Sequence, residues 1–162
     1  MGIVLFDTNI LIDALNGISE AADELAYWEE PAISAMTWME VYAGASRPGE
    51  GPDIDQFMRN CEFHVVPIDA ELMHEAAKLV AERRHAGSKK IALTDAVIAA
   101  TAKMRGLVII TRDKKDFKGA DIRIPYELQT KISVSVINVN PPGDTPTASS
   151  FRSKSKRKKS AR

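Results

Sequence analysis

One short stretch near the amino terminus sets the class of fold: Ile3-Val4-Leu5-Phe6-Asp7-Thr8-Asn9. Its four apolar residues in a row are typical of a strand that is buried on both faces. The run ends abruptly at an acid and two polar residues, and apolar residues then recur at helical spacing from Leu11 to Leu15. Asn16-Gly17 stops this helix. The stretch therefore predicts a buried strand that passes directly into a helix, with Asp7 at the junction.

The same alternation of short apolar runs and helical periodicity continues along the chain. Further strands are predicted at residues 32–34, 63–68 and 107–110, and further helices at 19–28, 37–44, 53–60, 70–84 and 94–106, with a loop at 47–52. Ser19 is expected to cap the first of these helices, and Thr37 to begin the second. Strands that alternate with helices indicate an α/β fold with a mostly parallel sheet. In such sheets, ligands bind beyond the carboxyl ends of the strands.

The pattern weakens after Pro125, and three parts are expected. Residues 1–130 form the α/β domain, residues 131–148 hold an added edge strand at 132–139 and a proline-rich linker, and residues 149–162 form a basic tail. The tail has the composition of a disordered segment. It is either an arm that follows nucleic-acid phosphates or a plain disordered terminus.

The net charge of the chain is zero because two segments of opposite charge cancel each other. Lys and Arg number 22, as do Asp and Glu, so the formal net charge is zero. Seven of the cations lie in residues 152–162, where there is no acid, so residues 1–151 carry 15 cations against 22 acids and a charge of −7. An acidic body excludes a uniformly basic nucleic-acid binder.

Cysteine content and hydropathy indicate in which cellular compartment the protein is expected. One cysteine, Cys61, excludes an intrachain disulfide and a zinc site built from several cysteines. No apolar run approaches the roughly 18–20 residues that a membrane helix needs, and no signal peptide is evident. We therefore expect a cytoplasmic protein that has no membrane contact.

Four acids stand where the predicted chain passes between elements. Asp7 and Asp113 each follow an apolar strand, Asp95 opens a helix, and Glu40 lies in the first turns of a helix that follows a strand. A parallel sheet would bring all four to one edge, where they would repel and raise one another's pKa values. Mg²⁺ or Mn²⁺, which prefer hard oxygen ligands, would relieve that repulsion. The pattern indicates phosphoryl chemistry.

Each acid also has an ordinary structural interpretation. Asp95 could favour a helix dipole, Glu40 could complete a capping box with Thr37, and Asp113 could form a turn. Taken singly, each acid fits the structural role better. Their joint placement at one predicted edge favours the functional role.

Four blocks of sequence resemble one family. They are residues 5–13 (Leu5 to Asp13), 33–44 (Ile33 to Gly44), 93–102 (Leu93 to Ala102) and 111–117 (Thr111 to Phe117). In this order they resemble the PIN-domain ribonucleases, most closely the VapC-type toxins of type II toxin–antitoxin systems. The resemblance spans residues 3 to about 128, and beyond Leu128 it fades.

The resemblance implies a fold, a site and a reaction. The implied fold is a three-layer α/β/α sandwich around a mostly parallel sheet. The implied metal-binding and catalytic acids are Asp7, Glu40, Asp95 and Asp113, with Asp116 as the alternative to Asp113, and the supporting polar residues are Thr8, Asn9 and Thr111. The implied reaction is Mg²⁺- or Mn²⁺-dependent hydrolysis of RNA that leaves 5′-phosphate and 3′-hydroxyl ends.

The resemblance also implies partners. These are an RNA substrate, a VapB-like antitoxin and a second copy of the chain in a homodimer. Candidate contacts to RNA phosphates near the predicted edge are Arg112, Lys114, Lys115 and Lys118. Trp38, Met39 and Tyr42, near Glu40, could line an apolar groove for a partner or belong to the core.

Two other functions remain open from sequence. A haloacid-dehalogenase-like phosphatase also begins with a strand that ends in aspartate, but it expects a second aspartate where this chain has Asn9. A non-catalytic nucleic-acid-binding module could act through the basic tail, but it would have no use for the four acids.

Overall fold

The computed structural model describes residues 3–44, 51–87, 90–130 and 134–144. The predicted loop at 47–52 falls largely outside the described residues, and the tail at 149–162 falls wholly outside them. The helices are α1 (Thr8–Leu15), α2 (Ser19–Tyr27), α3 (Ala35–Gly44), α4 (Gly51–Asn60), α5 (Ala70–His85), α6 (Leu93–Arg105) and the 3₁₀ turn η1 (Pro142–Asp144). The strands are β1 (Val4–Phe6), β2 (Pro31–Ser34), β3 (His64–Val66), β4 (Val108–Ile110), β5 (Ile122–Arg123), β6 (Glu127–Thr130) and β7 (Val134–Ile137).

Five strands form a parallel sheet in the order β3-β2-β1-β4-β5, with β1 at its centre. Phe6 pairs with Ile33 on one side and with Ile110 on the other. The three central strands therefore end nearly level, and the residues that follow them meet at one edge. The prediction of a mostly parallel α/β sheet is confirmed.

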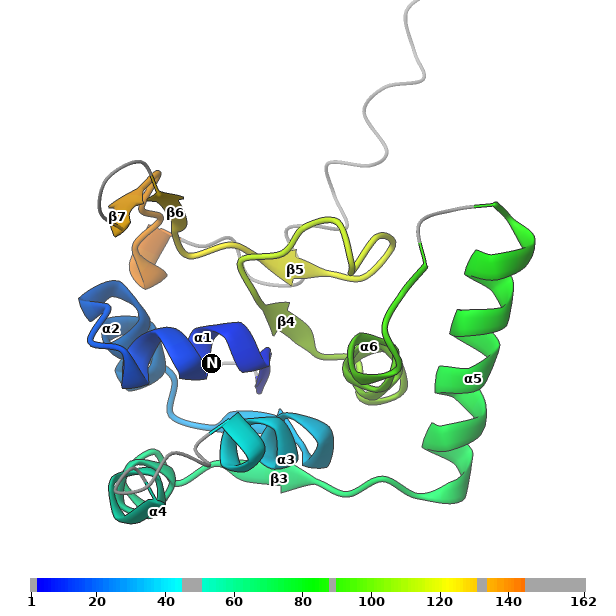
Figure 1. Ribbon diagram of the computed structural model, residues 1–162, viewed down its shortest axis with the longest axis horizontal. Helices are drawn as coiled ribbons and strands as arrows, with labels where there is room; N and C mark the ends of the chain where they lie inside the picture. Colours follow the sequence, from blue (N-terminus) through cyan, green and yellow to red (C-terminus); the bar gives the residue numbers. More distant parts are fainter. Residues whose placement is uncertain (1–2, 45–50, 88–89, 131–133, 145–162) are drawn as a thin grey trace, which may run out of the picture.

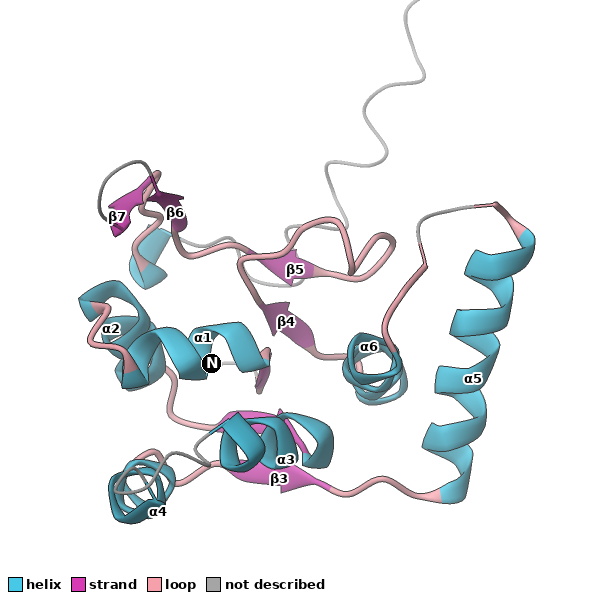
Figure 2. Ribbon diagram, viewed as in Figure 1, coloured by secondary structure: helices cyan, strands magenta, loops and turns pink. Residues whose placement is uncertain are grey.

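Helices flank the parallel sheet on both sides (Figures 1 and 2). Alternating side chains of the strands build a core on each face of the sheet. One core joins Val4, Phe6, Ile33 and Ile110 to Leu11 of α1, Leu25 of α2 and Ile54 of α4. The other joins Leu5, Ala32 and Ile109 to Ile98 and Ala102 of α6. Helix α5 packs outside α6 through Leu72 and Ala76. Helices thus cover both faces, as the predicted three-layer sandwich requires.

One predicted helix cap and one predicted helix start are wrong. The cap of α2 is Ile18, and the Ser19 hydroxyl donates to the Glu20 carboxylate instead of capping the helix. Helix α3 begins at Ala35, because the Ser34 hydroxyl accepts hydrogen bonds from the backbone N–H groups of Met36 and Thr37, at 3.1 and 3.2 Å. Ser34 already satisfies the first turn of α3, so Thr37 lies inside the helix and forms no capping box with Glu40.

The predicted edge strand forms, but it pairs elsewhere. Strand β7 lies within residues 132–139 and pairs antiparallel with β6 in a separate two-stranded sheet, not at the edge of the parallel sheet. Leu128 and Val136 of this hairpin pack against the core next to α1 and α2. Pairing between two strands this close in sequence has little loop-closure cost. Among the described helices, none is long and apolar enough to span a bilayer.

Candidate active site

Asp7 lies where the central strand β1 passes into α1. Its backbone N–H donates to the Ile110 carbonyl at 2.9 Å, so the chain keeps the register of the sheet up to this residue. Its side chain is 5% exposed. Thr111 follows the neighbouring strand β4 at the same level, and its hydroxyl donates to Asp7 Oδ2 at 2.6 Å. The level ends of two parallel strands thus place an acid beside a hydroxyl.

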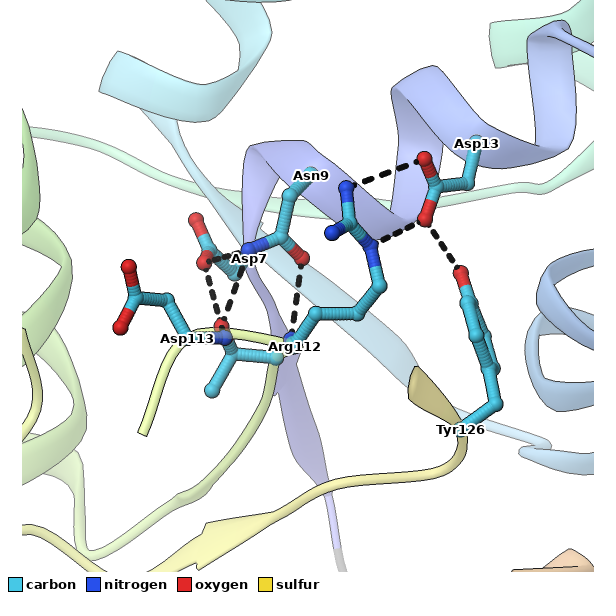
Figure 3. A network of polar contacts seen from close by, with 7 residues as sticks. Asp7, Asn9, Asp13, Arg112, Asp113 and Tyr126 are labelled. Carbon is cyan, nitrogen blue, oxygen red and sulfur yellow. Dashed lines mark hydrogen bonds and ion pairs between the residues drawn. The ribbon is translucent and has the colours of Figure 1, made fainter. Parts of the chain in front are cut away.

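Asn9, in the first turn of α1, completes this arrangement (Figure 3). Its side-chain Nδ2 donates to Asp7 Oδ2 at 2.7 Å and to the Thr111 hydroxyl at 3.0 Å. Two side chains therefore hold one oxygen of Asp7 in place. The structure thus places Asn9 and Thr111 against Asp7, and their predicted role in orienting a metal-binding acid stays a prediction.

Glu40 and Asp95 approach Asp7 from two other helices. Glu40, on α3, accepts a hydrogen bond from the Thr8 hydroxyl of α1 at 2.5 Å. Asp95 lies in the first turn of α6. Burial of Asp7 raises its pKa from 3.8 to about 6, and the charges of Asp95 and Glu40 add to the increase, against the hydrogen bond from Thr111. The three carboxylates therefore lie close enough to interact.

Asp113 joins the site through Thr111 and also shapes a turn. Its backbone N–H donates to the Thr111 hydroxyl at 2.9 Å. Its carboxylate Oδ1 accepts from the backbone N–H groups of Lys115, at 2.8 Å, and Asp116, at 3.4 Å. The carbonyl oxygen of Asp116 accepts from Arg83 of α5 at 2.6 Å. The structure thus gives Asp113 the turn-forming contacts of its ordinary interpretation, two residues after Thr111, which bonds Asp7.

The candidate RNA-contacting cations differ in their surroundings. The side chains of Lys114, Lys115 and Lys118 are exposed on the segment that follows Asp113. Arg112 is different, because its guanidinium forms an ion pair with Asp13 of α1. Asp13 also accepts a hydrogen bond from Tyr126, whose pKa is raised well above its ordinary value by burial and by this bond, so the phenol stays protonated.

Of the three residues near Glu40 that could line a groove, Trp38 and Met39 lie at the surface, whereas Tyr42 is partly buried and packs against the core. Trp38 and Met39 are 40% and 45% exposed, which excludes the core as their place. The rings of Trp38 and Tyr42 lie 4.3 Å apart, and the Tyr42 hydroxyl donates to Asp55 of α4 at 2.6 Å.

The donor set fits a hard divalent cation in kind and in charge. Carboxylate oxygens are the ligands that Mg²⁺ and Mn²⁺ prefer, and a cation would relieve the repulsion that adds to the effect of burial on the pKa of Asp7. The hydroxyl of Thr37, one turn before Glu40, is buried and lacks a hydrogen-bond partner, as polar atoms beside a water or ion site can. In the described part of the chain, no three His, Cys, Asp or Glu side chains converge closely enough to enclose an ion. The acids would have to draw together around it.

A family model described as PIN domain matches residues 4–122. These residues hold strands β1 to β4, the first residue of β5 and all four acids. The chain belongs to the PIN-domain family. The family resemblance inferred from the four sequence blocks, and the fold class with it, is confirmed.

Several known proteins are similar to this PIN domain. Plasmid stability protein StbB of Pseudomonas syringae pv. tomato is 29% identical over 143 residues, which cover 76% of this chain and 99% of that protein. Toxin FitB of Neisseria gonorrhoeae is 27% identical over 134 residues, which cover 75% of this chain and 95% of that protein. A solved toxin–antitoxin complex from Klebsiella pneumoniae aligns with 36% identity and a TM-score of 0.66, over 76% of this chain and 98% of that one.

Sequence reasoning missed the buried charges around the PIN-domain site. Asp13 and Tyr126 were not singled out, and neither was the ion pair of Glu24 with Arg123, in which both side chains are buried. A signal for Asp13 existed, because it follows Asn9 by one helical turn and therefore lies on the same face of α1. Tyr126 and Arg123 carry no such signal, since their partners lie 113 and 99 residues away.

The raised pKa of Asp7 leads to a stability prediction. In metal-free protein, Asp7→Asn is expected to raise the free energy of unfolding by up to about 3 kcal/mol at pH 8. The pKa of Asp7 is about 6 in the folded protein, compared with 3.8 for an aspartate in an unfolded chain, so the folded state binds the proton more tightly. Wild-type stability therefore falls as the pH rises from about 4 to about 7, whereas the asparagine variant lacks this loss.

Urea unfolding of both proteins at pH 4, 6 and 8, with a chelator present, measures the difference. The advantage of the variant should be small at pH 4 and largest at pH 8. An advantage that does not change with pH would contradict the electrostatic origin.

Proposed function

We propose that this protein is a metal-dependent ribonuclease, the toxin of a toxin–antitoxin pair. The observation that carries the proposal is that Asp7, Glu40 and Asp95, from three separate elements, lie within electrostatic reach of one another at the carboxyl edge of a parallel sheet. Acids gathered beside a buried hydroxyl–amide pair suit hydrolysis of a phosphodiester, whose own charge requires cations. The similarity to toxin FitB and to a toxin–antitoxin complex supports the same function.

Asp7 and Asp95 would hold Mg²⁺ or Mn²⁺, with Glu40 and Asp113 completing the set and Asp116 as the alternative to Asp113. The bound ion would supply positive charge to the scissile phosphate and acidity to a water. Around it, Thr111 and Asn9 fix one oxygen of Asp7, and Thr8 fixes one oxygen of Glu40. Because the carboxylates of Asp7 and Glu40 are already oriented, they need not be reoriented at a cost in free energy during the reaction.

The basic side chains next to Asp113 would guide the RNA. Lys114, Lys115 and Lys118 are exposed along one short segment and would contact phosphates on either side of the cleaved bond. Their attraction is needed because the body of the protein is acidic.

The proposed partners are a VapB-like antitoxin and a second copy of the chain, in the cytoplasm. The exposed Trp38 and Met39 offer apolar contact area next to the helix face that carries Glu40. Aromatic residues and methionine are enriched in such interfaces. The phosphatase alternative is set aside, because Asn9 binds Asp7 and Thr111 where that mechanism would need a second aspartate.

The proposal is tested by incubating purified protein with a mixture of single-stranded RNAs in the presence of Mn²⁺, Mg²⁺ or EDTA. We expect cleavage with either ion, loss of cleavage in EDTA, and its return when excess Mn²⁺ is added. Products should carry 5′-phosphate and 3′-hydroxyl ends. Cleavage that persists in EDTA, or products with cyclic phosphate ends, would reject a hydrolytic metal mechanism.

A further inference from the structure

Asp13 lies at the centre of a buried polar cluster beside the candidate site (Figure 3). It is on α1, one turn after Asn9, and its side chain is 7% exposed. Both of its oxygens accept hydrogen bonds from the Arg112 guanidinium, Oδ2 from Nε and Oδ1 from Nη2, the latter at 3.1 Å. Oδ2 also accepts from the Tyr126 hydroxyl at 2.7 Å. Three donors satisfy a carboxylate that would otherwise be costly to bury.

Arg112 connects this cluster to the site through the backbone. It stands between Thr111 and Asp113, and its own N–H donates to Asn9 Oδ1 at 3.3 Å. The Thr111 hydroxyl next to it donates to Asp7 and accepts from the N–H of Asp113. Any movement of Arg112 would therefore change the group that holds Asp7.

The segment from Thr111 to Asp113 is held to α1 through Asn9, which contacts the Thr111 hydroxyl and the N–H of Arg112. On its other side, the N–H of Thr111 donates to the Arg123 carbonyl of β5 at 3.0 Å, which fixes the end of β4 but not the turn after it. The Asp13–Arg112 ion pair adds a charged contact between this turn and α1. Since α1 also carries Thr8 and Asn9, the pair sets the turn relative to the helix that orients Glu40 and Asp7.

We infer that Asp13 and Tyr126 are positioning residues that act through Arg112 to hold the Thr111–Asp113 turn against Asp7. This inference rests on the proposed ribonuclease function for its kinetic consequence. It assigns the Arg112 guanidinium to Asp13, not to RNA. The paired geometry also explains why arginine stands here, because the planar fork of a guanidinium engages two carboxylate oxygens and an ammonium cannot.

The inference and the RNA-contact alternative predict opposite kinetic patterns. Asp13→Asn weakens the pair and releases Arg112. If Arg112 positions the turn, kcat should fall by about 10–100-fold with KM nearly unchanged, the usual loss when residues that orient a metal ligand are removed. If Arg112 contacts RNA, its release should lower KM. Arg112→Lys keeps the charge but not the fork, so positioning predicts a similar loss of kcat, and RNA contact predicts nearly normal kinetics.

The experiment compares full-length wild type, Asp13→Asn and Arg112→Lys, with Glu75→Gln as the matched control. Glu75 also accepts from two side chains, Lys78 and Lys103, but on the outer surface of α5 and α6, away from the site. The control should keep wild-type kcat. Nearly normal kinetics for Arg112→Lys, or a lower KM for Asp13→Asn, would overturn the inference.

Amide hydrogen exchange in the metal-free protein gives a second readout that does not depend on activity. Peptides that cover residues 111–118 should exchange at least about 10-fold faster in Asp13→Asn than in wild type or in Glu75→Gln, because local opening becomes easier. If wild type does not cleave RNA, the proposed function fails, and this exchange still decides the positioning role. Unchanged exchange in Asp13→Asn overturns it.

Discussion

Replacing Asp95 with asparagine is expected to reduce the rate of RNA cleavage at least about 100-fold, since loss of a residue that only orients a metal ligand already costs about 10–100-fold. The substitution removes one of the two charges that interact with Asp7. It keeps the size of the side chain in the first turn of α6. The loss of a favourable helix-dipole contact, about 0.3–1 kcal/mol, leaves the protein folded, so the variant separates chemistry from stability.

The measurement is the initial rate on a defined RNA at saturating Mn²⁺, together with calorimetric titration of Mn²⁺. Asp23→Asn is the matched control, because Asp23 is an exposed acid on α2. The Asp95 variant should bind Mn²⁺ more weakly than wild type, and the Asp23 variant should behave as wild type in both assays. If the Asp95 variant cleaves as fast as wild type, the activity does not come from this site.

A second substitution, Arg123→Met, is expected to lower the free energy of unfolding by about 3–5 kcal/mol. The Arg123 guanidinium donates to both oxygens of Glu24, at 2.7 and 2.8 Å, and to the Asn140 carbonyl at 2.6 Å. The side chain of Glu24 is 1% exposed. Without Arg123, this carboxylate keeps a hydrogen bond from Trp28 but has lost its charged partner in the core.

Denaturant unfolding of wild type and variant measures the cost. Lys103→Ala serves as the control, because its ion pair with Glu75 is at the surface, where solvent screens it and it should contribute little to stability. The double variant Glu24→Met with Arg123→Met should recover most of the loss, since a buried pair can often be replaced by apolar residues. Equal costs for Arg123→Met and Lys103→Ala would show that burial does not determine the strength of the pair.

The acids of the candidate site were predictable because local signals mark them. Asp7 and Asp113 end apolar runs, and Asp95 begins a periodic one, so their places in the elements follow from short windows of sequence. A parallel sheet then brings them to one edge without any knowledge of specific pairs. The same reasoning gave four of the five strands of the parallel sheet and the helices around it, but not β5, which has only two residues.

The surrounding contacts were not predictable in this way. The partner of Asp13 lies 99 residues away, and periodicity says nothing about which distant cation will meet a buried acid. The start of α3 depended on which of two hydroxyl residues would cap it, and Ser34 took the role because it directly ends β2. The partner of β7 could not be read from that strand alone, since an isolated strand can add to a sheet or form a hairpin.

The three central strands end level, so the position of Asp7 depends on the number of residues in β1 as much as on their identity. Phe6 is in register with both Ile33 and Ile110, so Asp7 occupies the first position beyond the paired rows. Side chains alternate between the faces of a strand, so deletion of one residue from Val4–Phe6 would draw Asp7 back by one position and turn it toward the opposite face. This fold should therefore tolerate the exchange of one apolar residue for another in the central strand. Insertions and deletions should be tolerated only in the connections between elements.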